Sequence, residues 1–167
     1  MDLVRRMLEH IPNCSRSHLV EYANSHPSEF AMLVNHAFSG ECSKCQNGRS
    51  KLLDLVDMLM PRLALDVISH ALEESDIRIR VQGLQAAYRL GISSFNDDLV
   101  ELLTSDIEPF VVKKWVVHIL SMSDPRRFAR VLRSLARNRR ENPELRVEAI
   151  YALTNIIDGK TIGTLCI

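Results

Sequence analysis

Residues 145–153 read LRVEAIYAL, and two earlier stretches share this pattern at a spacing of 33 residues: VKKWVVHIL at 112–120 and IRVQGLQAA at 79–87. Each stretch has an aliphatic residue first, a basic residue second, and a small or aliphatic residue at its fifth and eighth positions. A fixed period of about 20 to 50 residues indicates stacked structural repeats. The pattern therefore predicts three copies of one helical unit.

The fifth and eighth positions of the pattern share one face of a helix, because they are three residues apart. Their occupants are Gly83, Val116, Ala149, Ala86, Ile119 and Ala152. Small side chains let a neighbouring helix approach closely. This explains a glycine at position 83, although glycine inside a helix costs about 1 kcal/mol relative to alanine. We expect this face to be buried.

Apolar residues recur at helical spacing along almost the whole chain, and the prolines mark helix boundaries. Five prolines are placed to open helices: Pro27, Pro61, Pro109, Pro125 and Pro143. Pro12, Gly91 and Gly159 are placed to follow helix ends, and Asp124 and Asn142 to cap helix starts. Helices are expected at 2–10, 16–24, 27–38, 50–60, 62–74, 77–90, 96–104, 108–121, 125–138 and 143–157.

Each matched stretch follows a shorter amphipathic helix, so the units are helical hairpins. The expected fold class is all-α, an α-solenoid of stacked hairpins (HEAT-like or armadillo-like) with about ten helices. Residues 1–61 form a helical bundle or degenerate repeats with a cysteine-containing loop at 39–48, residues 62–158 form three repeats, and residues 159–167 form a tail. No linker divides the chain, so one structural domain is expected.

The matched stretches resemble the second helices of HEAT repeats, especially the short type found in phycobilisome-lyase-like proteins. That helix carries the string aliphatic-Arg-x-x-Ala-x-x-Ala-Leu, which residues 145–153 reproduce and residues 79–87 approximate. The middle copy departs from it at Val116 and Ile119, and residues 1–60 lack the string. The family consists mostly of interaction scaffolds without a common active site, so the resemblance implies a binding protein.

Composition narrows the function further. The 167 residues carry 21 Lys+Arg and 21 Asp+Glu, so the net charge is zero and no global field attracts nucleic acid or membranes. Hydrophobic residues make up 46%, which suits a folded core. The first residues, MDLVRRMLEHIP, lack the apolar segment of a signal peptide, and four cysteines suit a reducing compartment. We expect a cytoplasmic protein with no membrane partner.

Arginines form a row along one predicted helix. Arg126, Arg130, Arg133 and Arg137 recur at spacings of four, three and four, and Arg140 extends this arginine row. Between positions 125 and 140 there are seven arginines and no acidic residue. Two interpretations stay open. Acidic residues one repeat earlier (Asp97, Asp98 and Glu101) can pair with the row, or the row can dock phosphate or an acidic protein segment, since the planar guanidinium suits both.

A second candidate binding surface consists of Lys113, Lys114 and Trp115. A tryptophan beside cations can anchor a partner peptide or stack on a base. The repeat pattern places polar residues, Gln82 and Glu148, at the position of Trp115. We therefore expect this tryptophan to be partly exposed.

Cys42 and Cys45 have the C-x-x-C spacing of a zinc site. Such a site needs four ligands, and the candidates to complete it are His36, Cys14 and His18. There is no second C-x-x-C, so we expect loop thiols without metal or cofactor. The sequence also lacks the HExxH, GxGxxG and GxSxG motifs and predicts no catalytic residue. The expected function is non-enzymatic protein binding, with nucleic-acid association as the alternative.

Overall fold

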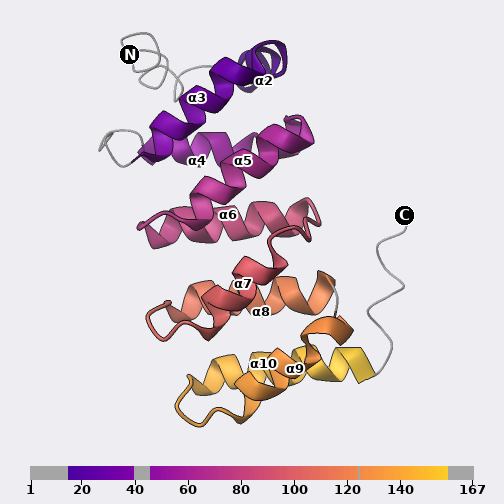
Figure 1. The fold of residues 1–167 in the computed structure, drawn as a ribbon. Helices are drawn as coiled ribbons and strands as arrows, with labels where there is room; N and C mark the ends of the chain where they lie inside the picture. The colour runs from indigo at the N-terminus through magenta and orange to yellow at the C-terminus, as the bar shows by residue number, and fades with distance from the viewer. Residues whose placement is uncertain (1–14, 40–45, 124, 158–167) are drawn as a thin grey trace. The chain divides into compact units, whose positions relative to one another are not determined.

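The computed structural model describes residues 15–39, 46–123 and 125–157, and within these ranges all regular elements are helices (Figure 1). The expected all-α class is confirmed for this part of the chain. The elements are α2 (Arg16–Ser25), α3 (Pro27–Phe38), α4 (Gln46–Asp54), the 3₁₀ helix η2 (Val56–Met58), α5 (Pro61–Leu72), α6 (Ile77–Arg89), α7 (Asn96–Thr104), α8 (Phe110–Ser123), α9 (Pro125–Arg137) and α10 (Pro143–Ile157). The helix expected at 2–10 lies outside the described residues.

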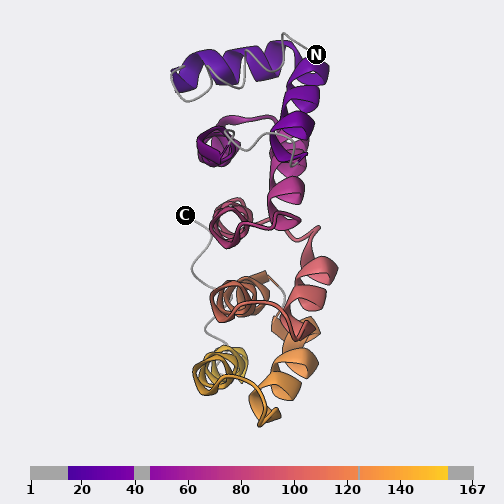
Figure 2. The ribbon, with the colours of Figure 1, turned by 90° about the vertical axis from the view of Figure 1, so that its left-hand side faces the viewer.

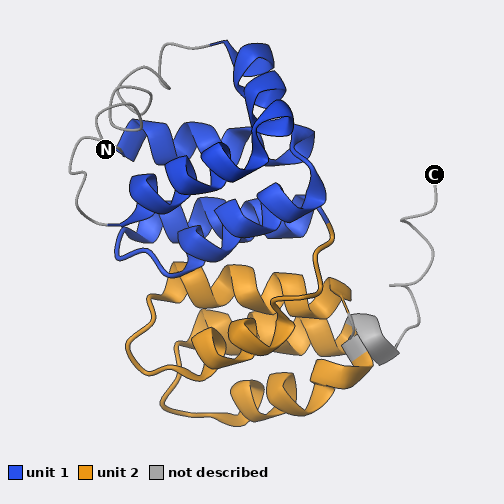
Figure 3. Cartoon of the chain, turned by 45° about the horizontal axis from the view of Figure 1, so that its top comes forward, with its two compact units in different colours: residues 1–90 blue, residues 91–167 orange. Residues whose placement is uncertain are grey.

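The chain divides into two compact units, residues 1–90 and residues 91–167 (Figure 3). That the chain forms a single structural domain stays a prediction. The boundary follows α6 at Gly91, whose φ of 61° lies in the left-handed region. Glycine adopts this conformation without a steric penalty, which is why it follows so many helix ends.

In the first unit, α5 and α6 form a hairpin, α3 packs against α5, and α4 packs against α6. The hairpin closes tightly at Gly83, where an ideal Cβ would lie only 2.9 Å from the Cβ of Ala71. Gly83 and Ala86 are both buried, as expected from the repeat pattern. A close approach between two helix backbones therefore explains the mid-helix glycine.

Helix α4 differs from the sequence expectation, because it begins at Gln46 inside the predicted loop and ends at Asp54. Its polar first turn is satisfied by distant groups. Gln46 donates a hydrogen bond to Asp76, and Arg49 is buried, with its Nε donating to the carbonyl oxygen of Ala37 at 2.6 Å. The chain then forms η2 and is extended at Met60 (φ −56°, ψ 143°), because the residue before a proline disfavours the α conformation.

In the second unit, α7 pairs with α8 and α9 pairs with α10, and α8 packs directly against α10. Figure 2 shows α8 and α10 end-on and side by side. The matched positions Val116, Ile119, Ala149 and Ala152 are all buried, as expected. Asn142 caps α10 as predicted, because its side-chain oxygen accepts the backbone N–H of Glu144 at 2.8 Å.

Replacing Gly83 tests the close approach of α5 and α6. The new methyl group of Gly83→Ala must displace the Cβ of Ala71, which is fixed to the backbone of α5. We expect a net loss of about 1 kcal/mol from overpacking, despite the better helix propensity of alanine. Thermal unfolding should show a fall in Tm of roughly 2–4 °C.

The matched control is the same substitution in an Ala71→Gly background, where the obstructing methyl is gone. There Gly83→Ala should leave Tm unchanged or raise it. An equal effect in both backgrounds would contradict the packing explanation, since a double-mutant cycle isolates the contact between the two side chains.

Candidate docking surface

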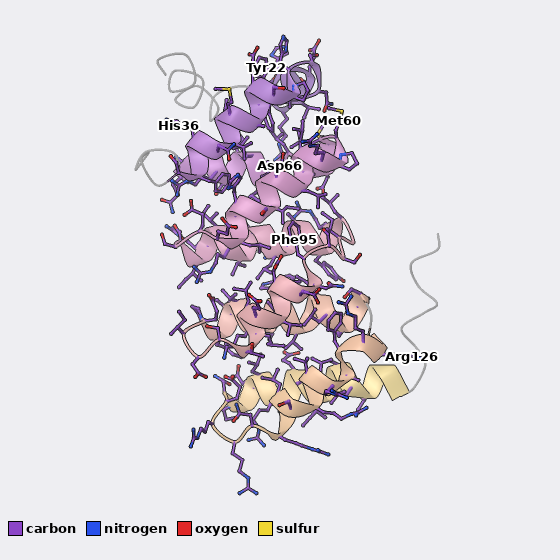
Figure 4. The ribbon with its side chains drawn as sticks, in the orientation of Figure 1. Tyr22, His36, Met60, Asp66, Phe95 and Arg126 are labelled. Carbon is purple, nitrogen blue, oxygen red and sulfur yellow. The ribbon has the colours of Figure 1, made fainter. Side chains whose placement is uncertain are left out.

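Helix α9 has two chemically opposite sides. Phe128, Leu132 and Leu135 are buried. Because an α-helix rotates about 100° per residue, these three residues lie on the side of α9 opposite the arginines. All five members of the arginine row are exposed: Arg126, Arg130, Arg133, Arg137 and Arg140. Figure 4 labels Arg126 at the start of this helix. Because the apolar side of α9 is buried, the arginine row on the opposite side faces solvent.

The arginine row has no carboxylate partner among the residues that the structure describes. The expected ion pairs with the acidic residues of α7 are present only in part. Asp97 accepts Arg127 Nη2 at 2.8 Å, whereas neither Asp98 nor Glu101 makes an ion pair within the described ranges. The ion-pair interpretation holds for Arg127, a residue outside the row.

Repulsion among the arginines of the row destabilises α9. The first turn carries Arg126 and Arg127 and no acidic residue, although the helix dipole favours negative charge there. Like charges spaced three or four residues apart destabilise a helix by about 0.2–0.5 kcal/mol per pair. Arg137 lies in the last turn, where the dipole favours a cation. An anion bound along the row would relieve this repulsion.

The structure removes Lys113 from the predicted binding surface. Its side chain is buried, with 4% of the residue exposed, and its Nζ donates to Glu141 Oε2 at 2.8 Å. The pKa of the Glu141 carboxyl is lowered, and the hydrogen bond from Lys113 is the largest cause of this shift. Sequence reasoning missed this because Glu141 lies 28 residues away, in the turn before α10.

The other two members of that surface are exposed to different degrees. Lys114 is exposed and pairs with Glu148 Oε1 at 2.8 Å, and this hydrogen bond raises the pKa of its ammonium group. Trp115 is half-buried, in agreement with the expected partial exposure, and its ring meets that of His118 edge-on at 5.9 Å. The cations of this surface therefore already have partners.

The zinc hypothesis concerns residues that the structure mostly leaves out. Cys14, Cys42 and Cys45 lie outside the described residues, while His36 lies half-buried on α3. Within the described ranges, no cluster of histidine, cysteine or acidic side chains is suited to a metal ion.

Sequence reasoning missed an apolar surface on α10. Val147, Ile150 and Tyr151 are exposed on the side of this helix opposite its buried Leu145 and Ala149. The sequence signal for this surface is the repeat itself, because Ile150 has an aliphatic counterpart, Val117, 33 positions earlier. Val117 is buried in α8, whereas Ile150 is exposed. The last helix thus carries apolar residues at positions that an earlier copy covers.

Comparisons with protein-family models, curated proteins and solved structures find no match to this chain. None of the helices in residues 15–39, 46–123 and 125–157 is long and apolar enough to cross a membrane.

The Lys113–Glu141 pair generates a prediction for stability and pH. Glu141→Gln should lower stability by about 3 kcal/mol at neutral pH, because it leaves a buried ammonium without its counter-charge. A loss of this size corresponds to a fall in Tm of roughly 6–12 °C. A lowered carboxyl pKa stabilises the fold above the unfolded value of about 4.3. The difference between parent and variant should therefore shrink as pH falls below that value and vanish below the lowered pKa of the native carboxyl.

Glu148→Gln is the matched control, since its pair with Lys114 is exposed on both sides. Exposed pairs contribute about 0.2–1 kcal/mol, so this variant should melt within a few degrees of the parent. Equal losses from the two substitutions, or a Glu141→Gln deficit that does not shrink as pH falls below about 4.3, would show that the buried pair does not stabilise the fold.

Proposed function

We propose that this chain is a non-enzymatic protein-binding scaffold whose arginine row docks an acidic segment of a partner protein. The proposed architecture is an α-solenoid of HEAT-like hairpins. Two features support it: the 33-residue sequence period and the packing of α8 against α10 between successive hairpins of the second unit. Stacked hairpins present extended surfaces suited to recognition.

The observation that carries the proposal is the exposed arginine row without carboxylate partners among the described residues. A surface that repels itself is stabilised by a ligand of opposite charge. Guanidinium groups bind carboxylates through two parallel hydrogen bonds, so a row of them fits an acidic segment with repeated carboxylates.

Two features favour a protein partner over nucleic acid. The chain has zero net charge, and Asp97, Asp98 and Glu101 are exposed on α7 in the same unit, so they would repel a long polyanion that extends past the row more than a short acidic segment confined to it. In addition, Trp115 is half-buried and contacts His118 edge-on, so its ring is not freely offered for base stacking.

Charge removal tests the row. Arg130, Arg133, Arg137 and Arg140 are replaced together by Gln, which keeps helix propensity while removing charge. A fluorescein-labelled 20-residue peptide of alternating Glu and Ala serves as the probe. We expect parent binding to weaken as salt rises, and the quadruple variant to bind at least tenfold more weakly. Arg127→Gln, in the same helix but already paired with Asp97, is the control and should retain binding.

The same variant separates docking from stability. If the row has no internal partners, its removal should leave Tm unchanged or raise it. A fall in Tm with unchanged peptide binding would refute the proposal. A 20-nucleotide oligothymidine that binds more tightly than the peptide, with log affinity falling by about 0.7 per phosphate against log salt, would establish the nucleic-acid alternative instead.

A further inference from the structure

The outer face of α10 repeats the chemistry of a face that is covered in α8. Four residues of α10 lie on this face: Arg146, Ile150, Leu153 and Thr154. Each matches a residue 33 positions earlier in α8, in the same order: Lys113, Val117, Leu120 and Ser121. A cation, a β-branched residue, a leucine and a hydroxyl thus recur at the same positions. We call the α10 set the outer face.

The two faces differ in burial. All four residues of the α8 set are buried, and Val117 is only 2% exposed. On α10, Ile150 is 48% exposed, Thr154 is exposed, and both Arg146 and Leu153 are half-buried. The same chemistry is therefore covered in one helix and open in the next.

The layer that covers α8 is known. Helix α10 packs against α8, and the turn before α10 brings Glu141 to Lys113 at 2.8 Å. A second carboxylate, Glu148 of α10, reaches Lys114 at 2.8 Å. The cover is thus a helix with aliphatic and small residues whose preceding turn supplies a carboxylate to the buried cation.

We infer that the outer face of α10 is a docking site for a helical hairpin of a partner protein. The hairpin stacks on α10 as α10 stacks on α8, with an aliphatic side chain over Ile150 and a carboxylate at Arg146. This interaction uses α10 and does not rest on the arginine row of α9.

The charge state of the outer face specifies the partner. Arg146 donates one hydrogen bond through Nε to the carbonyl oxygen of Ala136 at 3.1 Å, and it makes no ion pair with a described carboxylate. Burying this guanidinium beneath another layer requires a counter-charge. A second copy of this face would bring a second Arg146, whereas an acidic hairpin neutralises the one present.

The apolar area around the face supports docking rather than exposure to water. Val147 and Tyr151 flank Ile150 and are also exposed, Tyr151 at 64%. Exposed apolar side chains that gather on one face of a protein mark interaction sites.

The probe is a synthetic peptide of residues 138–157, blocked at both ends and labelled with fluorescein, because it contains the turn and helix that cover α8. Its binding to the full chain is followed by fluorescence anisotropy. We expect saturable binding that weakens at least tenfold in the chain variant Ile150→Glu. The matched control is Ile107→Glu, at a 90% exposed position before α8, which should bind like the parent. A Glu141→Lys peptide should also bind at least tenfold more weakly.

A second variant keeps the test valid if the free peptide does not fold. Residues 125–157 span one 33-residue period, so a second copy of them inserted after position 157 extends the repeat in register. In this copy the arginines matching Arg126, Arg130, Arg133 and Arg137 are replaced by Glu. The insertion should raise Tm, and Ile150→Glu in the original α10 should abolish the gain.

Three results would overturn the inference. The first is that neither the peptide nor the inserted hairpin depends on Ile150. The second is concentration-dependent dimerisation of the parent that Ile150→Glu abolishes, which would make a second copy the occupant. The third is a tenfold gain in peptide affinity on deleting residues 158–167, which would assign the face to the chain's own C-terminal segment. Peptide binding that survives loss of the arginine row separates this inference from the proposed function.

Discussion

Close packing at small residues fixes the rotation of each helix, and the exposed surfaces of this protein follow from that rotation. At Gly83 the neighbouring helix approaches so closely that even a methyl group is obstructed by Ala71. In α10 the corresponding small residue, Ala149, is fully buried. Because successive residues are about 100° apart, burying Ala149 leaves Ile150 and Tyr151 outside. The exposure of these two apolar side chains is thus a geometric consequence of the core.

The same constraint governs α9. Its buried side contains Phe128 and Leu132, so the arginine row is held on the opposite, exposed side. Arg127 is rotated about 100° from Arg126 around the helix axis, and its side chain reaches Asp97. Proximity in sequence therefore does not decide which arginine is neutralised. The side of α9 from which each arginine projects decides it, and burial of the apolar residues fixes that side.

Local signals predicted the all-α class and most of the described helices. From α5 to α10, the expected and observed helix ends agree within about two residues, because prolines and an N-terminal cap mark the boundaries. The sequence predicts that α4 starts later than it does in the structure. Its first turn is stabilised by partners far along the chain, such as Glu74, which pairs with Arg49 at 3.0 Å. For the same reason, burial of Lys113 was not predictable from its own helix. Contacts of high sequence separation have no local pattern.

The contrast between Lys113 and Arg146 shows how charge decides which surfaces stay open. Both cations occupy the same position of the repeat, yet Lys113 is buried because the next layer supplies Glu141, and Arg146 lies beside no described carboxylate. A buried cation is tolerated only with a counter-charge. The arginine row instead stays exposed, and on α9 only Arg127 has an ion pair with a described carboxylate, that of Asp97. The arginine row and Arg146 of the second unit are therefore cations that no described carboxylate neutralises.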